Sequence, residues 1–288
     1  MRKGRVIRVT TAAAVAVLSA AALAVTAGPA SAEGSDPGFA PADQATVRPG
    51  SMTYTNGAQC TSNFVFTDGT DVYIGQAAHC AGTGDSTETD GCTSASLPLG
   101  TPVDVVGASR PGKLAYSSWL SMQAAGEKDP DTCTYNDFAL VRLDPADVSR
   151  TNPTLPYYGG PVGVDQDGTQ PGDIVFGYGN SKLRAGLEAL RPKTGTSLGT
   201  SGGGRTHTVA SLPPGIPGDS GSGYVSADGS ALGLLSTLNI APQAGTNGVA
   251  DLHSALDYAN DSGDLDNDVE LVPGDQPFTP KPVPVDVG

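Results

Sequence analysis

The chain has 288 residues, rich in glycine (39) and proline (23), and its 30 acidic against 16 basic residues give a formal charge of −14. So acidic a chain repels phosphate backbones and anionic headgroups, which argues against nucleic acid or a membrane surface as a partner. Frequent turn residues with short apolar runs between them predict many short strands rather than long helices.

Residues 1–32 have the pattern of a secretory signal peptide. A basic start precedes the apolar run Ala12–Val25, and small residues at 30–32 suit a signal peptidase. The run is too short for a comfortable membrane span, and no later stretch is long and apolar enough, so we expect an exported, extracellular protein. Removal of the leader leaves 12 basic residues against 30 acidic ones, a formal charge of −18. Residues 33–50 are expected to be a short N-terminal segment or pro-segment.

The first predicted element is a β-hairpin that ends at a histidine. Strand formers fill Thr61–Thr67 and Asp71–Gly75 on either side of an Asp-Gly turn, and the hairpin runs into the sequence QAAHC, in which the histidine is His79. Small residues there allow a tight turn, and a neighbouring half-cystine would hold the imidazole in place. A general base needs such fixed geometry.

Further short strands are predicted along the rest of the chain. The last two are joined across an Asp-Gly turn. The candidates are Pro102–Ala108, Phe138–Leu143, Asp173–Tyr178, Thr206–Ser211, Gly223–Ser226 and Ala231–Thr237.

A glycine-rich serine loop, GDSGSG from Gly218 to Gly223, precedes the last two strands. Glycines around Ser220 permit a sharp turn that exposes its hydroxyl and lets the N–H groups of Gly218 and Ser220 converge, as an oxyanion hole requires. A Gly/Ser-rich loop without chemistry is common in such a chain, so this run by itself decides little.

The C-terminal part is predicted to be one helix and a tail. Apolar residues recur at helical spacing over residues 249–259. Residues 261–288 are acidic and then proline-rich, which predicts a disordered or extended tail. The acidic run from Asp264 to Asp268 resembles a calcium loop, but Val269 stands where the tight-turn glycine should be, so a solvated linker is the preferred interpretation.

Three histidines and four cysteines limit the possible chemistry. His253 falls in the predicted helix and His207 in a predicted strand, where surface or structural roles are more common than catalysis, which leaves His79 as the candidate base. In an exported chain the even number of cysteines predicts two disulfides of open connectivity, and their spacing disfavours a metal site. We expect no cofactor and no metal.

Three motifs together resemble the trypsin/chymotrypsin family of serine proteases, in a bacterial, actinobacterial-type secreted form. The sequence AAHC (77–80) is similar to the histidine motif of that family, NDFALV (136–141) to its aspartate motif and GDSG (218–221) to its serine motif. GYGN (177–180) is similar to the stretch that opens its second lobe. The order His79, Asp137, Ser220 is that of chymotrypsin.

The resemblance implies an all-β fold of two six-stranded antiparallel barrels with a short C-terminal helix. The protease domain would span residues 51–260, with the first barrel over about 51–165 and the second over about 170–250. Ser220 would be the nucleophile, His79 the base, Asp137 the residue that orients it, and the Gly218 and Ser220 amides the oxyanion hole. The expected partners are protein or peptide substrates, and the enzyme is expected to be a monomer.

The specificity pocket departs from the trypsin pattern. By resemblance it is lined by Pro214, Ser236, Leu238 and Gly248, and Ser236 also supports the triad carboxylate. Cleavage after Lys or Arg needs a carboxylate at 214, so an apolar or small substrate side chain is expected. Leu238, where glycine is usual, would narrow the pocket.

Two structural questions also follow from the resemblance. The Ile-Val amino terminus that pairs with the acid before the nucleophile in animal members is missing between Glu33 and Cys60, so Asp219 needs another partner. The candidates are Arg142, Arg205 and a processed amino terminus. By analogy, Cys60 pairs with Cys80, and Cys92 with Cys133.

Two other functions compete with this interpretation. An α/β-hydrolase is disfavoured because Ser222 stands where its Gly-x-Ser-x-Gly motif needs glycine, and because the order of the catalytic residues differs. The stronger alternative is a catalytically silent, protease-like secreted binding module, because a fold does not guarantee activity.

Overall fold

The computed structural model describes residue 1 and residues 38–84, 88–239 and 244–283. The chain divides into two units, Met1–Asp36 and Pro37–Gly288, and everything below concerns the second. The predicted signal peptide therefore lies almost entirely outside the described residues. None of the helices in the described part is long and apolar enough to cross a membrane.

The first half is an eight-stranded antiparallel sheet in the order β14-β3-β4-β7-β6-β5-β1-β2. Buried and more exposed residues alternate along β1 and β5, whereas all five residues of β4 are buried because β3 and β7 flank it and side chains cover both faces. The strands are β1 (Met52–Thr55), β2 (Ala58–Thr61), β3 (Val65–Thr67), β4 (Val72–Gln76), β5 (Pro102–Val105), β6 (Gly112–Ser117), β7 (Ala139–Arg142) and β14 (Glu270–Leu271).

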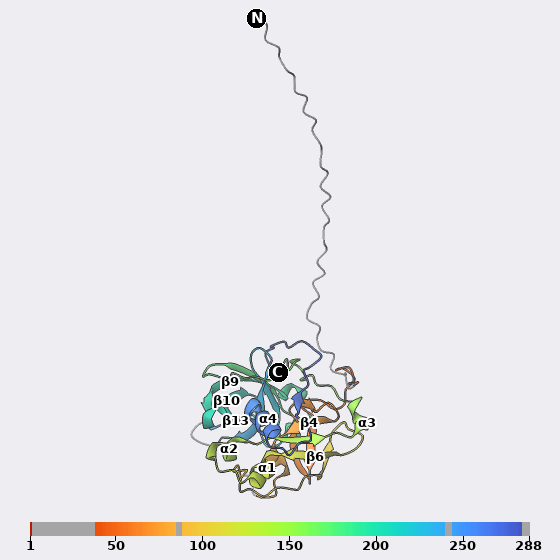
Figure 1. Cartoon of the computed structure of the whole chain (residues 1–288), viewed down its shortest axis with the longest axis vertical. Helices are drawn as coiled ribbons and strands as arrows, with labels where there is room; N and C mark the ends of the chain where they lie inside the picture. Colours follow the sequence, from red (N-terminus) through yellow and green to blue (C-terminus); the bar gives the residue numbers. More distant parts are fainter. Residues whose placement is uncertain (2–37, 85–87, 240–243, 284–288) are drawn as a thin grey trace. The chain divides into compact units, whose positions relative to one another are not determined.

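The second half is a closed six-stranded antiparallel barrel in the order β10-β13-β12-β11-β8-β9. In Figure 1 its strands β9, β10 and β13 lie to one side of α4, and β4 and β6 of the first sheet lie to the other. The strands are β8 (Ile174–Tyr178), β9 (Pro192–Ser201), β10 (Thr206–Leu212), β11 (Gly223–Val225), β12 (Ala231–Leu238) and β13 (Asn247–Asp251).

The all-β prediction is confirmed, and the second six-stranded barrel is closed as expected. The expected first six-stranded barrel is instead an eight-stranded sheet, with β2 at one edge and the tail strand β14 at the other. The largest hydrophobic cluster contains Phe66 and Phe138 of the first half together with Phe176 and Leu234 of the second. This shared core joins the two halves.

Helices are short, and sequence analysis placed only one of them. The α-helices are α1 (Ser118–Ala125), α2 (Pro130–Tyr135), α3 (Pro145–Val148) and α4 (Leu252–Asp261), and the 3₁₀ turns are η1 (Ala78–Ala81), η2 (Lys182–Arg184), η3 (Glu188–Leu190) and η4 (Gly202–Gly204). The predicted helix at 249–259 begins three residues later than expected. Residues 249–251 belong to β13, which closes the barrel between β10 and β12, and Asp251 then caps α4 through the Ser254 N–H.

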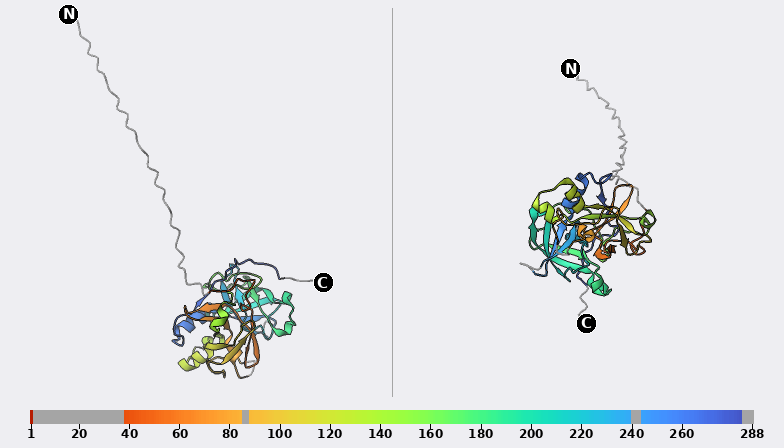
Figure 2. Two further views of the ribbon diagram at one scale, coloured as in Figure 1. Left: turned by 90° about the vertical axis from the view of Figure 1, so that its right-hand side faces the viewer. Right: turned by 90° about the horizontal axis from the view of Figure 1, so that it is seen from below.

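The C-terminal tail is packed along most of its length, which corrects the prediction of disorder for the residues described, up to 283. Strand β14 pairs with β3, and Asn260 holds both backbone groups of the buried Val269. Further on, the rings of Phe278 and Phe176 meet edge to face, with centroids 5.7 Å apart. Figures 1 and 2 show this dark-blue segment running over the surface of the body. The tail is polar in composition, but these specific contacts offset the conformational entropy that it loses on becoming ordered.

Candidate active site

His79 lies in the 3₁₀ turn η1 directly after β4, where the sequence predicted a tight turn. Ala77 and Ala78 are fully buried, and the Cys60–Cys80 disulfide ties this turn to β2. The imidazole is 27% exposed. The base candidate is therefore held by its neighbours and open on one side.

Asp137 stands just before β7 and holds His79 at two points. Its Oδ2 lies 2.7 Å from His79 Nδ1, and its Oδ1 accepts the His79 backbone N–H at 2.8 Å. Ser236 Oγ donates to the same Oδ2 at 2.6 Å. With Nδ1–H directed at the carboxylate, Nε2 is the ring nitrogen left to accept a proton.

The surroundings raise the pKa of His79. Burial opposes the charged imidazolium, but the negative charge of Asp137 and its hydrogen bond to the ring outweigh that effect. The imidazole is thereby a stronger base than a free histidine.

Ser220 sits in the loop between β10 and β11, against the segment that carries His79. Its carbonyl accepts the Thr61 N–H at 2.8 Å, and the Gly221 N–H donates to Leu235 O at 2.7 Å. Gly221 has φ +84°, and a Cβ there would lie 2.7 Å from the Ala77 nitrogen, so only glycine allows this approach. Among the described residues no hydrogen bond joins Ser220 Oγ to His79 Nε2. In unliganded enzymes such a bond is often long.

Two backbone N–H groups of this loop have no acceptor within the described part of the chain, those of Gly218 and Ser220. Gly218 has φ +94°, and a Cβ on it would collide with Gln59 Oε1. These are the two amides predicted to form an oxyanion hole. Unpartnered donors of this kind can receive a developing negative charge.

Asp219 is fully buried, and its cationic partners among the described residues are Arg184 and Lys193, neither of them among the predicted candidates. An Arg184 guanidinium nitrogen contacts Oδ2, and Lys193 Nζ lies 2.9 Å from the same oxygen. Arg142 instead pairs with Asp71 at 3.0 Å, and Arg205 makes no contact with Asp219 among the described residues. Nothing in the local sequence marks a strand lysine such as Lys193 as buried.

Asp219, Arg184 and Lys193 lie close enough for their charges to shift the pKa values of Asp219 and Lys193. Burial is the largest influence on Asp219 and raises its pKa, but the two cations together hold that pKa below its ordinary value. The pKa of Lys193 is lowered to about 8, because burial, together with the charge of Arg184, outweighs the opposing effect of Asp219. The two cations therefore favour the ionised carboxylate beside Ser220.

The predicted pocket residues lie on the segments around this loop. Pro214 is exposed and its carbonyl accepts from Arg184 at 2.8 Å, while Leu238 is 47% exposed at the end of β12. Gly248 on β13 pairs with Thr237. Sequence analysis missed the buried Asn247, whose side chain bonds Gly215 N–H (2.9 Å) and Thr237 O (3.2 Å).

The other two histidines are not part of the site. His207 is buried in β10, with Nε2 3.1 Å from Asp251 and Nδ1 3.0 Å from Thr169 Oγ1. His253 is half-exposed on α4, beside Asp257. Both positions agree with the structural roles expected for them.

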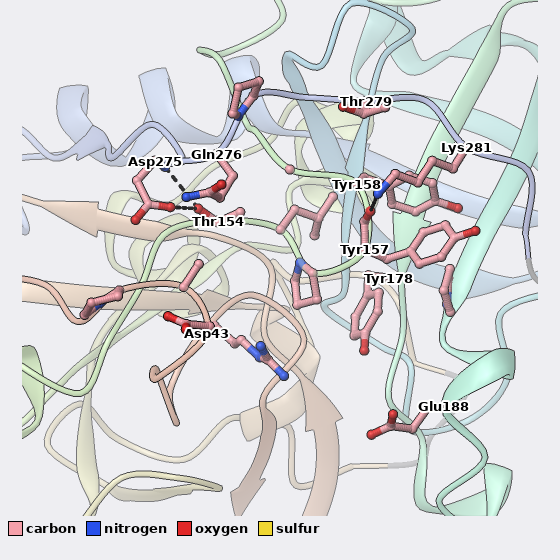
Figure 3. A pocket seen from close by; sticks show the side chains of 18 of the residues that line it. Asp43, Thr154, Tyr157, Tyr158, Tyr178, Glu188, Asp275, Gln276, Thr279 and Lys281 are labelled. Atoms are coloured by element: carbon pink, nitrogen blue, oxygen red, sulfur yellow. Dashed lines mark hydrogen bonds between the residues drawn. The ribbon is translucent and has the colours of Figure 1, made fainter.

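A hollow of about 1030 Å³ lies elsewhere and contains no triad residue (Figure 3). Tyr157, Tyr158 and Tyr178 line it together with the tail. Two of its charged groups already have partners: Asp275 accepts from Thr154 Oγ1 at 2.5 Å, and Lys281 Nζ donates to Tyr157 O at 3.0 Å.

Metal-ligating side chains gather at two places in the described part. Each group contains two cysteines, Cys60 and Cys80 with His79, and Cys92 and Cys133 with Asp90. The sulfurs of each group are joined in a disulfide, so they offer no thiolate for a metal. Both disulfides have the predicted pairing.

An antiparallel sheet and a closed antiparallel barrel, with a His–Asp pair from the first and a serine loop from the second, define the chymotrypsin-like serine protease fold. The described chain has this fold. No family model and no curated protein matches the sequence.

Solved structures similar to this chain include three actinobacterial proteases. Protease A of Thermobifida fusca is 17% identical, with a TM-score of 0.50, over 80% of this chain and 100% of its own. A Nocardiopsis protease is 18% identical, with a TM-score of 0.46, over 78% of this chain and 98% of its own. Cellulomonas bogoriensis chymotrypsin is 17% identical, with a TM-score of 0.47, also over 78% of this chain and 98% of its own.

Proposed function

We propose that this protein is a secreted serine endopeptidase that hydrolyses peptide bonds through an acyl-enzyme. The observation that carries the proposal is the geometry of His79: Asp137 holds its Nδ1 at 2.7 Å, Nε2 is left as a base, and the Ser220 loop packs against the same turn. The protease fold and the two unpartnered amides support it. The two disulfides fit an oxidising, extracellular compartment.

In the proposed reaction His79 Nε2 takes the proton of Ser220 as its Oγ attacks the substrate carbonyl. The Gly218 and Ser220 amides receive the negative charge of the tetrahedral intermediate. When the intermediate collapses, the C–N bond breaks and His79 returns the proton to the leaving amine. Water, activated by the same imidazole, then hydrolyses the Ser220 ester and restores the enzyme.

The substrate side chain next to the cleaved bond is proposed to be apolar or small. Pro214 supplies no carboxylate for a substrate cation, and Leu238 stands at the rim of the expected pocket. Asn247 adds a neutral polar group between the segments that contain Gly215 and Thr237, and its side chain forms hydrogen bonds with backbone atoms of both. Protein or peptide substrates that present Lys or Arg at this position would find no matching charge.

The test is covalent labelling of the protein spanning residues 33–288 with a biotinylated peptidyl diphenyl phosphonate. We expect one adduct, located at Ser220 by peptide mapping, and no adduct in Ser220→Ala or His79→Ala. Circular dichroism and thermal unfolding establish that each sample is folded. A folded wild-type protein that stays unlabelled would contradict the proposal and favour the silent binding module.

Specificity is tested separately by digesting a denatured protein mixture and sequencing the new ends. We expect cleavage after small or apolar residues. Predominant cleavage after Lys or Arg would contradict the proposed pocket while leaving the proposed reaction intact.

A further inference from the structure

Residues 216–219, just before Ser220, form a β-turn whose Pro-Gly centre is compatible with two turn types. Asp219 N–H donates to Ile216 O at 2.9 Å, which closes a turn with Pro217 and Gly218 at its centre. Proline at the second position and a φ of +94° at the third are the features of a type II turn. A type I turn would need only a rotation of the Pro217–Gly218 peptide, and glycine tolerates both values of φ.

The two forms differ in which group of that peptide faces each side. The peptide is trans, so its C=O and N–H point in opposite directions. If it rotated, the Pro217 oxygen would replace the Gly218 N–H. An oxygen there would repel an oxyanion instead of stabilising it.

Ser181 contacts this peptide directly, from the segment between β8 and η2. Its hydroxyl donates to Pro217 O at 2.6 Å, and its backbone N–H donates to Asp219 Oδ1 at 2.9 Å. The side chain is buried. Holding the Pro217 oxygen toward Ser181 directs the Gly218 N–H to the opposite side, where it has no partner among the residues described.

The next peptide is fixed independently. Gly218 O accepts from Thr61 Oγ1 at 2.7 Å and from Gln59 Nε2 at 2.9 Å. Arg184 and Lys193 hold the Asp219 carboxylate. Among the described contacts, Ser181 is therefore the side chain that selects the orientation of the Pro217–Gly218 peptide.

We propose that Ser181 is a positioning residue for the oxyanion hole, whose hydroxyl holds the turn at residues 216–219 in the form that presents the Gly218 N–H to the substrate. This inference rests on the proposed function. It adds a residue to the site that no motif contains, 38 positions before Asp219 in the sequence.

Ser181→Ala is the first test, with Ser94→Ala as the matched control. The control removes a buried serine hydroxyl that donates to another loop carbonyl, Asp90 O, also at 2.6 Å. The probes are a tetrapeptide 4-nitroanilide with an apolar residue next to the cleaved bond, the corresponding peptide aldehyde, which forms a tetrahedral adduct, and the product peptide acid.

For Ser181→Ala we expect kcat to fall about 10- to 100-fold, less than the 10²–10³-fold typical of deleting an oxyanion donor outright. KM and the affinity for the product acid should stay within twofold. The affinity for the aldehyde should weaken by the same factor as kcat/KM, because both depend on the oxyanion. Ser94→Ala should match the wild type in all four quantities.

Ser181 Oγ also accepts the Leu183 N–H at 3.1 Å, so its loss can affect folding as well. The isosteric pair Ser181→Thr and Ser181→Val separates the two effects, since both add the same bulk and only threonine has a hydroxyl. Threonine should retain the higher kcat and the tighter aldehyde binding.

Equal aldehyde affinities for the threonine and valine variants would overturn the proposal. So would a Ser181→Ala variant that loses kcat but binds the aldehyde as tightly as the wild type. Failure of the proposed function has a different signature, because the wild-type protein itself would then show neither phosphonate labelling nor turnover.

Discussion

Asp137 makes three short hydrogen bonds, to the ring and the backbone N–H of His79 and to the Ser236 hydroxyl. All three groups donate to it, and the bond to the ring fixes the imidazole tautomer and orientation. The same contact raises the pKa of His79 against the opposing effect of burial. The pH dependence of catalysis therefore reports on one residue pair.

The first prediction concerns the acid limb of the pH profile. His79 must be neutral to accept a proton, so kcat/KM should fall as the pH drops through its pKa, at a pH above the usual histidine value of about 6.5. In Asp137→Asn the raising influences are removed and burial remains, so the limb should move to lower pH. Turnover should fall by about 10⁴-fold.

The measurement is kcat/KM of the wild type from pH 4 to 9, with NMR titration of the His79 ring for both proteins. Asp71→Asn, a surface carboxylate paired with Arg142, is the control and should leave the limb in place. An unchanged ring pKa in Asp137→Asn would contradict the assignment.

At the scale of elements, the tail is part of the folded body. Strand β14 covers the outer edge of β3, which would otherwise offer unpaired backbone groups to another chain. Phe278 then packs on Phe176 in the shared core, and Asp275 bonds Asn152 (2.9 Å) and Thr154. A segment of proline and acidic residues can be ordered in this way because a few anchors fix it at intervals.

The corresponding prediction is that Phe278→Ala destabilises the protein by about 1–3 kcal/mol, because a partly buried aromatic ring loses its contacts with the core. Urea unfolding followed by fluorescence measures the change. Pro280→Ala, in an exposed part of the same tail, should stay within about 0.5 kcal/mol of the wild type. A tail that is disordered in solution would show no effect for either variant.

In the molecule as a whole, the two disulfides constrain different parts of the fold. Cys60–Cys80 closes 20 residues around β3, β4 and the His79 turn, and Cys92–Cys133 closes 41 residues that include β5, β6 and α1. Loop-closure entropy predicts that they stabilise the fold by about 3 and about 4 kcal/mol respectively. Only the first is adjacent to His79.

We therefore expect two double variants to separate stability from catalysis. Cys92→Ser with Cys133→Ser should lower the free energy of unfolding more, yet leave kcat of the folded fraction nearly unchanged. Cys60→Ser with Cys80→Ser should cost less stability but reduce kcat, since the turn that carries His79 loses its covalent tie to β2. Guanidinium unfolding and active-site titration give both quantities, and equal kcat values in the two variants would contradict this division.

The sequence by itself predicted the strand-rich fold, the His79, Asp137 and Ser220 motifs in order, and, through resemblance, both disulfides. These features depend on local turn chemistry, on alternation along short segments and on motif spacing, all of which are visible within a few residues. Only the tertiary structure identified Arg184 and Lys193 as the partners of Asp219, ordered the tail and placed Ser181 on the Pro217 carbonyl. Such contacts join residues far apart in the chain, where burial is decided by the packing of other elements and no local pattern encodes the partner.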